Sequence, residues 1–142
     1  MRMCRDPQLL LAVAAGPVAW LLLAWWLPLQ PGAAAWPLFW GVVLMPVLEE
    51  LVFRGLLQGW LLKRRWGRRR VGPVSVANLV TAGAFGAAHL LRRTVAWSML
   101  VIGPGLVFGH FRERYQGIAV SIVLHAWYNA GFIMLYAGGV AA

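Results

Sequence analysis

The chain has 142 residues, a length that favours one domain, and 61% of them are hydrophobic while only 12% are charged. Soluble domains have about 25% charged residues, so this composition indicates an integral membrane protein. The net charge of +9 does not indicate nucleic-acid binding, because the basic residues lie mostly in short segments between apolar runs. The single cysteine excludes an intrachain disulfide bond.

Five apolar runs are long enough to cross a bilayer, which takes roughly 20 residues of α-helix. We therefore expect an all-α fold, a polytopic transmembrane helix bundle with about five spans, in a single domain over residues 1–142. The connecting segments are short, so consecutive spans should be close neighbours. The second run is overlong and contains Pro46, where the helix should tilt or kink. The expected spans are residues 9–29, 34–62, 74–91, 95–111 and 117–136.

Lysine and arginine are distributed unequally between the two sides of this bundle. Five spans place ten of them on one side, including Arg2 and the basic loop KRRWGRRR at residues 63–70, against Arg92 and Arg93 on the other. Cytoplasmic loops of membrane proteins carry an excess of Lys and Arg, so the amino terminus should be cytoplasmic. The basic loop could also contact anionic lipid, which is compatible with this topology.

The sequence PVLEELVFRG, at residues 46–55, places three ionisable residues inside an apolar run. A charge at the centre of a spanning helix costs about 2.5–3.5 kcal/mol, so such residues indicate a functional site. Because a helix advances about 100° per residue, Glu50 and Arg54 share a face and Arg54 can neutralise Glu50. Glu49 is left without a cation on its own helix, which suits a carboxylate that handles a proton or polarises water. A charged pair that only locks two helices together is the structural alternative.

Two later runs carry polar pairs at helical spacing, FGAAH ending at His89 and HAWYN from His125 to Asn129. Taken singly, a histidine in a helix is more often a structural hydrogen-bonding group than a catalyst. Together with the acidic pair, however, these side chains supply the parts of a hydrolytic site. A carboxylate with an imidazole can deprotonate water, and a second imidazole with an amide can donate hydrogen bonds to an oxyanion. No serine has an obvious base partner, which disfavours a serine protease.

The three motifs EELVFR, FGAAH and HAWYN, in this order, resemble the EExxxR, FxxxH and HxxxN motifs of the CPBP family. This family is the CAAX-protease and bacteriocin-processing (Abi) group, and the matched motif core covers residues 46–131. The resemblance implies a glutamic-type intramembrane endopeptidase, with a prokaryotic inner membrane as the expected location. The implied roles are activation of the attacking water by Glu49 and His89, an oxyanion hole of His125 and Asn129, and support from Glu50, Arg54 and Phe85.

The resemblance also implies which cofactor and partners to expect. No cofactor is required, although two histidines and a glutamate could bind zinc; the HxxxN motif lacks a second strong ligand, so the metal-dependent form ranks second. The expected partners are the lipid bilayer and a membrane-anchored peptide or protein substrate, with no nucleic acid. Small members of the superfamily resemble sorting proteases that cleave carboxyl-terminal anchor segments, an analogy based on chain length.

Two other classes of function fit the same residues. A non-enzymatic binding or immunity protein could keep the fold and use the pocket to hold a peptide or partner. A proton-coupled transporter could use Glu49 and His89 as a relay, but five short spans without repeat symmetry disfavour it.

The two histidines are expected at different depths. Straight helices would place His89 about 22 Å and His125 about 12 Å from the cytoplasmic ends of their spans. A later start of the third helix, or unequal tilts, would bring them level.

Overall fold

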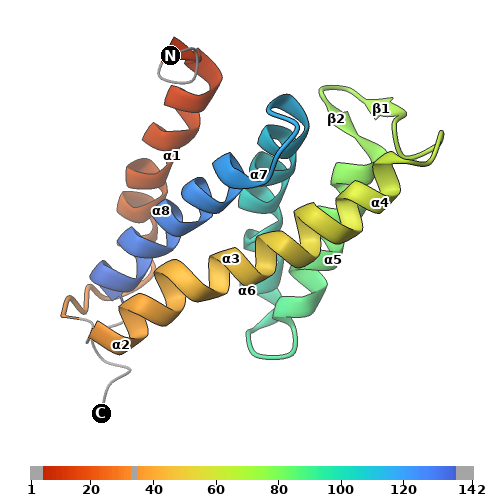
Figure 1. The fold of residues 1–142 in the computed structure, drawn as a ribbon. Coiled ribbons are helices and arrows are strands. Elements are labelled where there is room, and N and C mark those ends of the chain that lie inside the picture. Colours follow the sequence, from red (N-terminus) through yellow and green to blue (C-terminus); the bar gives the residue numbers. More distant parts are fainter. Residues whose placement is uncertain (1–4, 33–34, 137–142) are drawn as a thin grey trace. The chain divides into compact units, whose positions relative to one another are not determined.

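The computed structural model describes residues 5–32 and 35–136, and Arg2 and residue 34 of the expected spans lie outside them. Helices dominate the described residues, which confirms the predicted all-α class (Figure 1). The helical elements are α1 (Pro7–Leu23), α2 (Ala35–Leu38), the π-helix η2 (Phe39–Leu44), α3 (Met45–Glu50), the π-helix η3 (Leu51–Gln58), α4 (Gly59–Leu62), α5 (Val76–His89), α6 (Val95–Leu100), α7 (Ile102–Arg114) and α8 (Ala119–Tyr136).

Two segments in the described part of the chain are long and apolar enough to cross a membrane. They are Val95–Arg114, which joins α6 and α7, and Ala119–Tyr136, which is α8. Helix α1 is also apolar but has only 17 residues. It ends at Leu23, six residues before the expected end of the first span. Pro28 explains the early end, because proline disfavours helical geometry in the residue before it and has no amide hydrogen to continue the helix. The total of five spans stays a prediction.

Pro46 does not interrupt the second helical run, since every residue from α2 to the end of α4 is helical. Proline has no amide hydrogen, so the carbonyl of Val42, four residues earlier, receives no α-helical hydrogen bond from it. Wide π turns precede it in η2, where the amide of Met45 donates to the carbonyl of Trp40. A second π segment, η3, follows the acidic pair directly. Single π turns in α-helices are frequent at functional sites.

The fourth expected span is broken into α6 and α7 by a turn at Val101. Pro104 explains the break, because it cannot donate a hydrogen bond to the carbonyl of Leu100. Thr94 starts α6 as its N-cap, where its hydroxyl accepts a hydrogen bond from the amide of Trp97 at 3.3 Å. Helix α7 then continues to Arg114, three residues beyond the expected end.

The basic loop leads into a short antiparallel hairpin that the sequence did not predict, formed by β1 (Arg70–Val71) and β2 (Val74–Ser75). The turn between these strands consists of Gly72, with φ of 61°, and Pro73. Glycine adopts this left-handed conformation without strain, and it is favoured at the first central position of a tight hairpin turn. The hairpin leads directly into α5, whose N-cap is Ser75.

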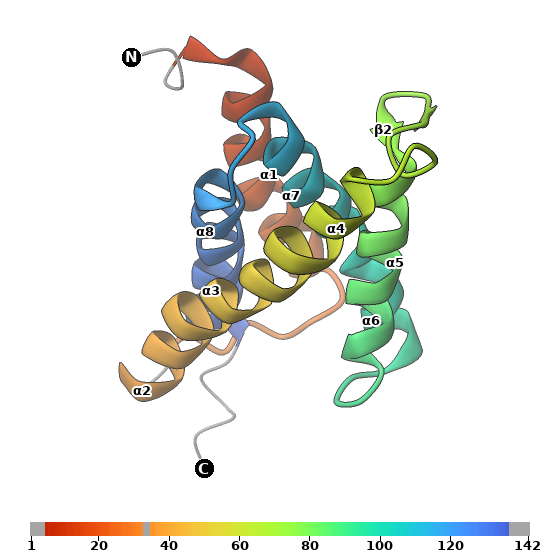
Figure 2. The same cartoon turned by 45° about the vertical axis from the view of Figure 1, so that its right-hand side comes forward.

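The chain divides into two compact units, Met1–Val47 together with Val123–Ala142, and Leu48–Ile122. In the first unit, α1 lies beside the residues of α8 that belong to it (Figures 1 and 2). The hydroxyl of Tyr128 donates to the carbonyl of Ala12 at 2.7 Å.

Glycine also allows α1 and α8 to approach closely. A Cβ atom on Gly131 of α8 would lie 2.1 Å from the ring of Trp20 in α1, so only glycine fits there. In the second unit, α5 packs against η3, α6 and α7 (Figure 2). This second unit contains the acidic motif and the FGAAH motif.

Candidate functional site

Three polar side chains form a buried row along the helical run through α3 and η3. Glu50, Arg54 and Gln58 follow one another at intervals of four residues, and each is 0% exposed. The ion pair predicted from the i,i+4 spacing is present, with 3.0 Å between Nη1 of Arg54 and Oε1 of Glu50. Breaking a buried ion pair by removing one partner typically costs about 3–5 kcal/mol. This row therefore contributes to the stability of the fold and is also a candidate site.

The guanidinium of Arg54 is enclosed by aromatic rings and by a backbone carbonyl of α7. Its carbon Cζ lies 4.7 Å from the ring centre of Phe85 and 5.4 Å from that of Phe108. Its Nη2 donates a hydrogen bond of 2.9 Å to the carbonyl of Gly105. Cation–π contacts are strongest when they are desolvated, as they are around this buried side chain. Arg54 therefore joins the acidic motif to Phe85 of the FGAAH motif.

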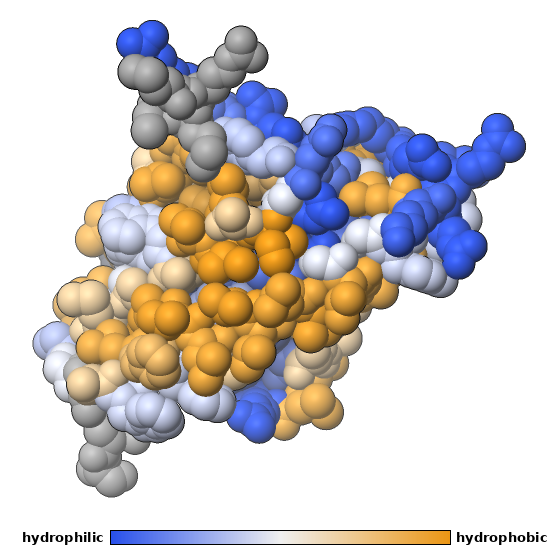
Figure 3. Space-filling view, viewed as in Figure 1, coloured by the Kyte–Doolittle hydropathy of each residue, from blue (hydrophilic) through white to orange (hydrophobic). Residues whose placement is uncertain are grey.

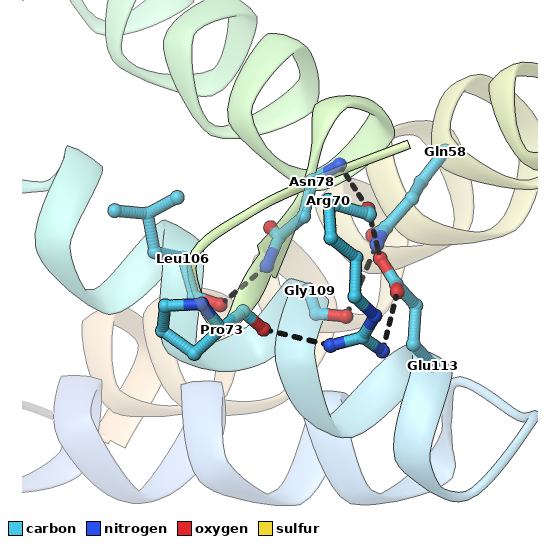
Figure 4. Close-up of polar contacts among 8 residues, drawn as sticks. Gln58, Arg70, Pro73, Asn78, Leu106, Gly109 and Glu113 are labelled. Carbon is cyan, nitrogen blue, oxygen red and sulfur yellow. Dashed lines mark hydrogen bonds and ion pairs between the residues drawn. The ribbon is translucent and has the colours of Figure 1, made fainter. Parts of the chain in front are cut away.

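A second set of polar contacts continues the row one turn further along (Figure 4). The amide nitrogen Nε2 of Gln58 donates to the carbonyl of Gly109 at 3.0 Å and to Oε1 of Glu113 at 2.9 Å. The same carboxylate oxygen accepts a hydrogen bond of 2.5 Å from the hydroxyl of Ser75. Figure 4 also shows Arg70 beside Glu113. Nη2 of Arg70 lies 4.0 Å from Oε2 of Glu113. Glu113 thus connects η3, the hairpin and α7.

Sequence reasoning missed Gln58 and Glu113. The signal for Gln58 was present, because it extends the Glu50 and Arg54 spacing by another four residues. Glu113 belongs to the segment RERYQ, which follows an apolar run. The sequence predicts that this segment is a connection outside the membrane. Only the packing of α7 against η3 and β2 brings it to these partners.

Two glycines of α7 make these contacts possible. Gly105 and Gly109 lie on the same face, four residues apart. A Cβ atom on Gly109 would lie 1.9 Å from Oδ1 of Asn78, whose Nδ2 donates to the carbonyl of Leu106 at 2.9 Å. Small residues at this spacing let membrane helices approach closely enough for polar side chains to reach backbone carbonyls.

The geometry of His89 determines which of its ring nitrogens is available. His89 is the last residue of α5 and is half-buried, with its ring 4.6 Å from the ring of Phe85. Its Nδ1 lies 2.9 Å from the carbonyl oxygen of Phe85. A carbonyl only accepts hydrogen bonds, so Nδ1 carries the proton in this contact. In the neutral ring, Nε2 then has the lone pair that can accept a proton or a hydrogen bond.

Glu49 lies next to this row on the same helix and is half-buried. The expectation that Glu49 has no cation on its own helix is wrong. The guanidinium of Arg54 interacts electrostatically with both Glu49 and Glu50, because the charge of a buried guanidinium reaches carboxylates on either side of the helix face. Glu49, Glu50, Arg54, Phe85 and His89 all belong to the second unit.

His125 and Asn129 lie on α8 within the first unit. Asn129 is half-buried, and its Nδ2 donates a hydrogen bond of 2.9 Å to the carbonyl of Gly41 in η2. An amide nitrogen has two hydrogens, so one remains for another acceptor. The structure thus describes the two halves of the expected site separately, and their convergence stays a prediction.

Each histidine can be placed along its own helix. Helix α5 starts at Val76 and helix α8 at Ala119, each two residues later than expected. At 1.5 Å per residue, His89 lies about 20 Å along its helix and His125 about 9 Å along its own. Both helices start two residues later than expected, so the later starts shorten these two lengths by the same amount.

Among the residues that the structure describes, no three His, Cys, Asp or Glu side chains form a group able to hold a metal ion. His89 would offer Nε2 to zinc in the metal-dependent alternative, since its Nδ1 is directed at the carbonyl of Phe85. That alternative stays a prediction and is decided by chelation.

Comparison with known proteins gives one family. The chain matches the model described as type II CAAX prenyl endopeptidase Rce1-like over residues 31–131, which contain all three motifs. No curated protein and no solved structure matches the chain. The matched region covers well over half of the sequence and agrees with the resemblance that the motifs gave. The chain therefore belongs to the Rce1-like family of CAAX-type membrane-embedded endopeptidases.

Proposed function

We propose that this protein is an intramembrane endopeptidase that hydrolyses a peptide bond of a membrane-anchored substrate with water activated by Glu49 and His89. Membership of an endopeptidase family supports the reaction class. The observation that carries the assignment of roles is the contact between Nδ1 of His89 and the carbonyl of Phe85, since it leaves Nε2 as the acceptor.

In this mechanism, Glu49 takes a proton from the water as its oxygen attacks the scissile carbonyl carbon. Nε2 of His89 accepts a hydrogen bond from the same water and orients it. The developing oxyanion receives hydrogen bonds from His125 and from the remaining amide hydrogen of Asn129. The proton held by Glu49 then goes to the amine nitrogen as the carbon–nitrogen bond breaks.

The ion pair of Glu50 and Arg54 has a supporting role in this proposal. Arg54 is fixed by Glu50, by Gly105 and by the ring of Phe85, so its charge is held at a constant position near Glu49. Phe85 contacts both Arg54 and His89 and thereby connects the acidic motif to His89.

The test is cleavage by the purified protein in liposomes, with two probes. One is a farnesylated CAAX peptide, and the other is a reporter protein that ends in an apolar helix and a basic tail. Product masses identify the scissile bond. We expect Glu49→Gln to abolish cleavage, because it removes the base and keeps the shape. Asp6→Asn is the matched control, since it also converts a carboxylate to an amide, and asparagine is an equally good N-cap for α1.

The two probes separate the substrate classes, and the variants separate the alternatives. Cleavage of the second probe alone would identify carboxyl-terminal anchors as the substrate class. Cleavage that chelation removes and zinc restores would replace the glutamic mechanism by the metal-dependent one. A cellular phenotype that survives Glu49→Gln would contradict catalysis and favour the binding or immunity protein.

A further inference from the structure

The basic hairpin, defined as residues 63–75, has a concentration of positive charge that the proposed catalysis does not use. Within the first eight of these residues the chain places six Lys and Arg. All six side chains are exposed, and the surface over the hairpin is strongly hydrophilic in Figure 3. They are Lys63, Arg64, Arg65, Arg68, Arg69 and Arg70.

The backbone of the basic hairpin is held in a defined conformation. The amide of Ala77 donates to the carbonyl of Gly67 at 2.9 Å, and the amide of Val76 donates to the carbonyl of Arg69 at 2.8 Å. A Cβ atom on Gly67 would lie 2.1 Å from the carbonyl oxygen of Leu61, so the chain folds back closely on the end of α4. The cations therefore project from an ordered surface, which lowers the entropy cost of binding a ligand.

Glu113 attaches the basic hairpin to the helices of its unit. It accepts the hydrogen bond from Ser75 and lies beside Arg70, whose Nη1 also donates to the carbonyl of Pro73 at 2.9 Å. By contrast, the side chains of Arg65 and Arg69 make no hydrogen bond or ion pair with any residue that the structure describes. These two arginines are therefore available to an external anion.

Apolar side chains accompany the cations on the surface of the basic hairpin. Trp66 is 45% exposed and Val71 is 61% exposed. Just before the hairpin, the half-exposed ring of Trp60 lies against the guanidinium of Arg64. Cζ of Arg64 is 4.7 Å from the ring centre. Tryptophan with arginine is typical of the headgroup layer, where an amphipathic ring and a positive charge are both favoured.

We propose that the basic hairpin binds anionic phospholipid headgroups of the leaflet that it faces. The charge is complementary, two arginines are uncommitted, and exposed apolar side chains stand beside them. The hairpin also joins α4 to α5 in a chain of a membrane-embedded family, so lipid headgroups are anions that it can reach. This site is separate from the peptide-bond chemistry and goes beyond it.

The test compares two double variants of the purified full-length protein. Arg65→Gln with Arg69→Gln removes the two uncommitted charges, and Arg92→Gln with Arg93→Gln removes two exposed arginines from the loop after α5. Figures 1 and 2 show this loop at the opposite end of α5 from the hairpin. Native mass spectrometry measures the dissociation constants for phosphatidylglycerol and phosphatidylcholine, and circular dichroism verifies that both variants keep their helices.

We expect the wild-type protein and the Arg92/Arg93 variant to prefer phosphatidylglycerol. The Arg65/Arg69 variant should lose about fivefold in affinity for each charge removed, or about 25-fold in all. Equal losses in both variants, or no preference in the wild-type protein, would overturn the proposal. It would also fail if a single-stranded oligonucleotide bound more tightly than phosphatidylglycerol and only the Arg65/Arg69 variant lost that binding. These lipid measurements do not depend on cleavage, so they fail or succeed independently of the proposed protease activity.

Discussion

Arg54 and Glu50 form an ion pair with 3.0 Å between Nη1 and Oε1, and both side chains are completely buried. Each of these buried charges needs the other, because either one alone would be a buried charge without a partner, which costs free energy. Arg54 holds its place through three further contacts, to the carbonyl of Gly105 and to the rings of Phe85 and Phe108. The pair therefore couples the acidic motif to α5 and α7.

Removal of one partner of this pair should be worse than removal of both. We expect Arg54→Met to lower the free energy of unfolding by about 3–5 kcal/mol, because Glu50 would stay buried without its cation. The double variant Glu50→Gln with Arg54→Met should recover part of that loss. Unfolding in mixed micelles, followed by circular dichroism, measures both. A double variant that is less stable than Arg54→Met would contradict the interpretation of the pair as a unit.

Two glycines of α7 should respond in opposite ways to the same substitution. Gly109→Ala places a methyl group against Asn78, where the Cβ would be 1.9 Å from Oδ1, so we expect a loss of about 1–3 kcal/mol. Gly103→Ala is the matched control, because nothing lies within 4 Å of its Cβ position. Alanine also has the higher helix propensity, so Gly103→Ala should be neutral or stabilising by up to about 1 kcal/mol. Thermal unfolding of both variants measures this difference, and equal losses would contradict it.

Glu113 should control the stability of the basic hairpin rather than catalysis itself. In Glu113→Ala, the hydroxyl of Ser75 and the amide of Gln58 lose their shared acceptor, and each unsatisfied buried group costs about 1–3 kcal/mol. We expect faster amide hydrogen exchange in residues 67–77, measured by mass spectrometry, while residues of α1 keep their protection. Unchanged exchange in the hairpin would show that Glu113 does not hold it.

Asn129 should affect the chemical step more than substrate binding. If its remaining amide hydrogen stabilises the oxyanion, Asn129→Leu should lower kcat by about 10²–10³-fold with little change in KM. The same substitution also removes the hydrogen bond to Gly41, so unfolding must be measured in parallel. Tyr128→Phe is the control on the same helix, since it removes a hydrogen bond to Ala12 and should cost about 1 kcal/mol without the kinetic effect. A rise in KM at constant kcat would contradict the assigned role.

His89 should work through one ring nitrogen. Replacement by Leu removes the ring nitrogen that accepts the hydrogen bond from the attacking water, so the water is no longer oriented and we expect kcat to fall by about 10²-fold. Phe85→Leu keeps most of the apolar volume and the backbone carbonyl that binds Nδ1, so its effect should be smaller. Steady-state cleavage of the probe that the wild-type protein accepts measures both variants. A larger loss for Phe85→Leu would place the ring, rather than the imidazole, at the centre of the site.

The sequence alone determined the features that depend on local spacing and composition. The apolar runs predicted a helical membrane protein, the i,i+4 interval predicted the Glu50–Arg54 pair, and the three ordered motifs identified the family. These inferences succeed because helix periodicity places residues four apart on one face whatever the surroundings are. The same rule would have added Gln58, which continues the row.

Only the tertiary structure decided which partners these residues find on other elements. The carbonyls of Gly105 and Gly109 accept hydrogen bonds from Arg54 and Gln58. Glu113 of α7 accepts hydrogen bonds from η3 and from the hairpin. No local pattern contains these contacts, because they join residues more than 35 positions apart and depend on how closely glycine lets two helices approach. The sequence did not predict the hairpin, because its two-residue strands are too short to show a periodic pattern. Packing around Gly67 and Ser75 holds these strands in place.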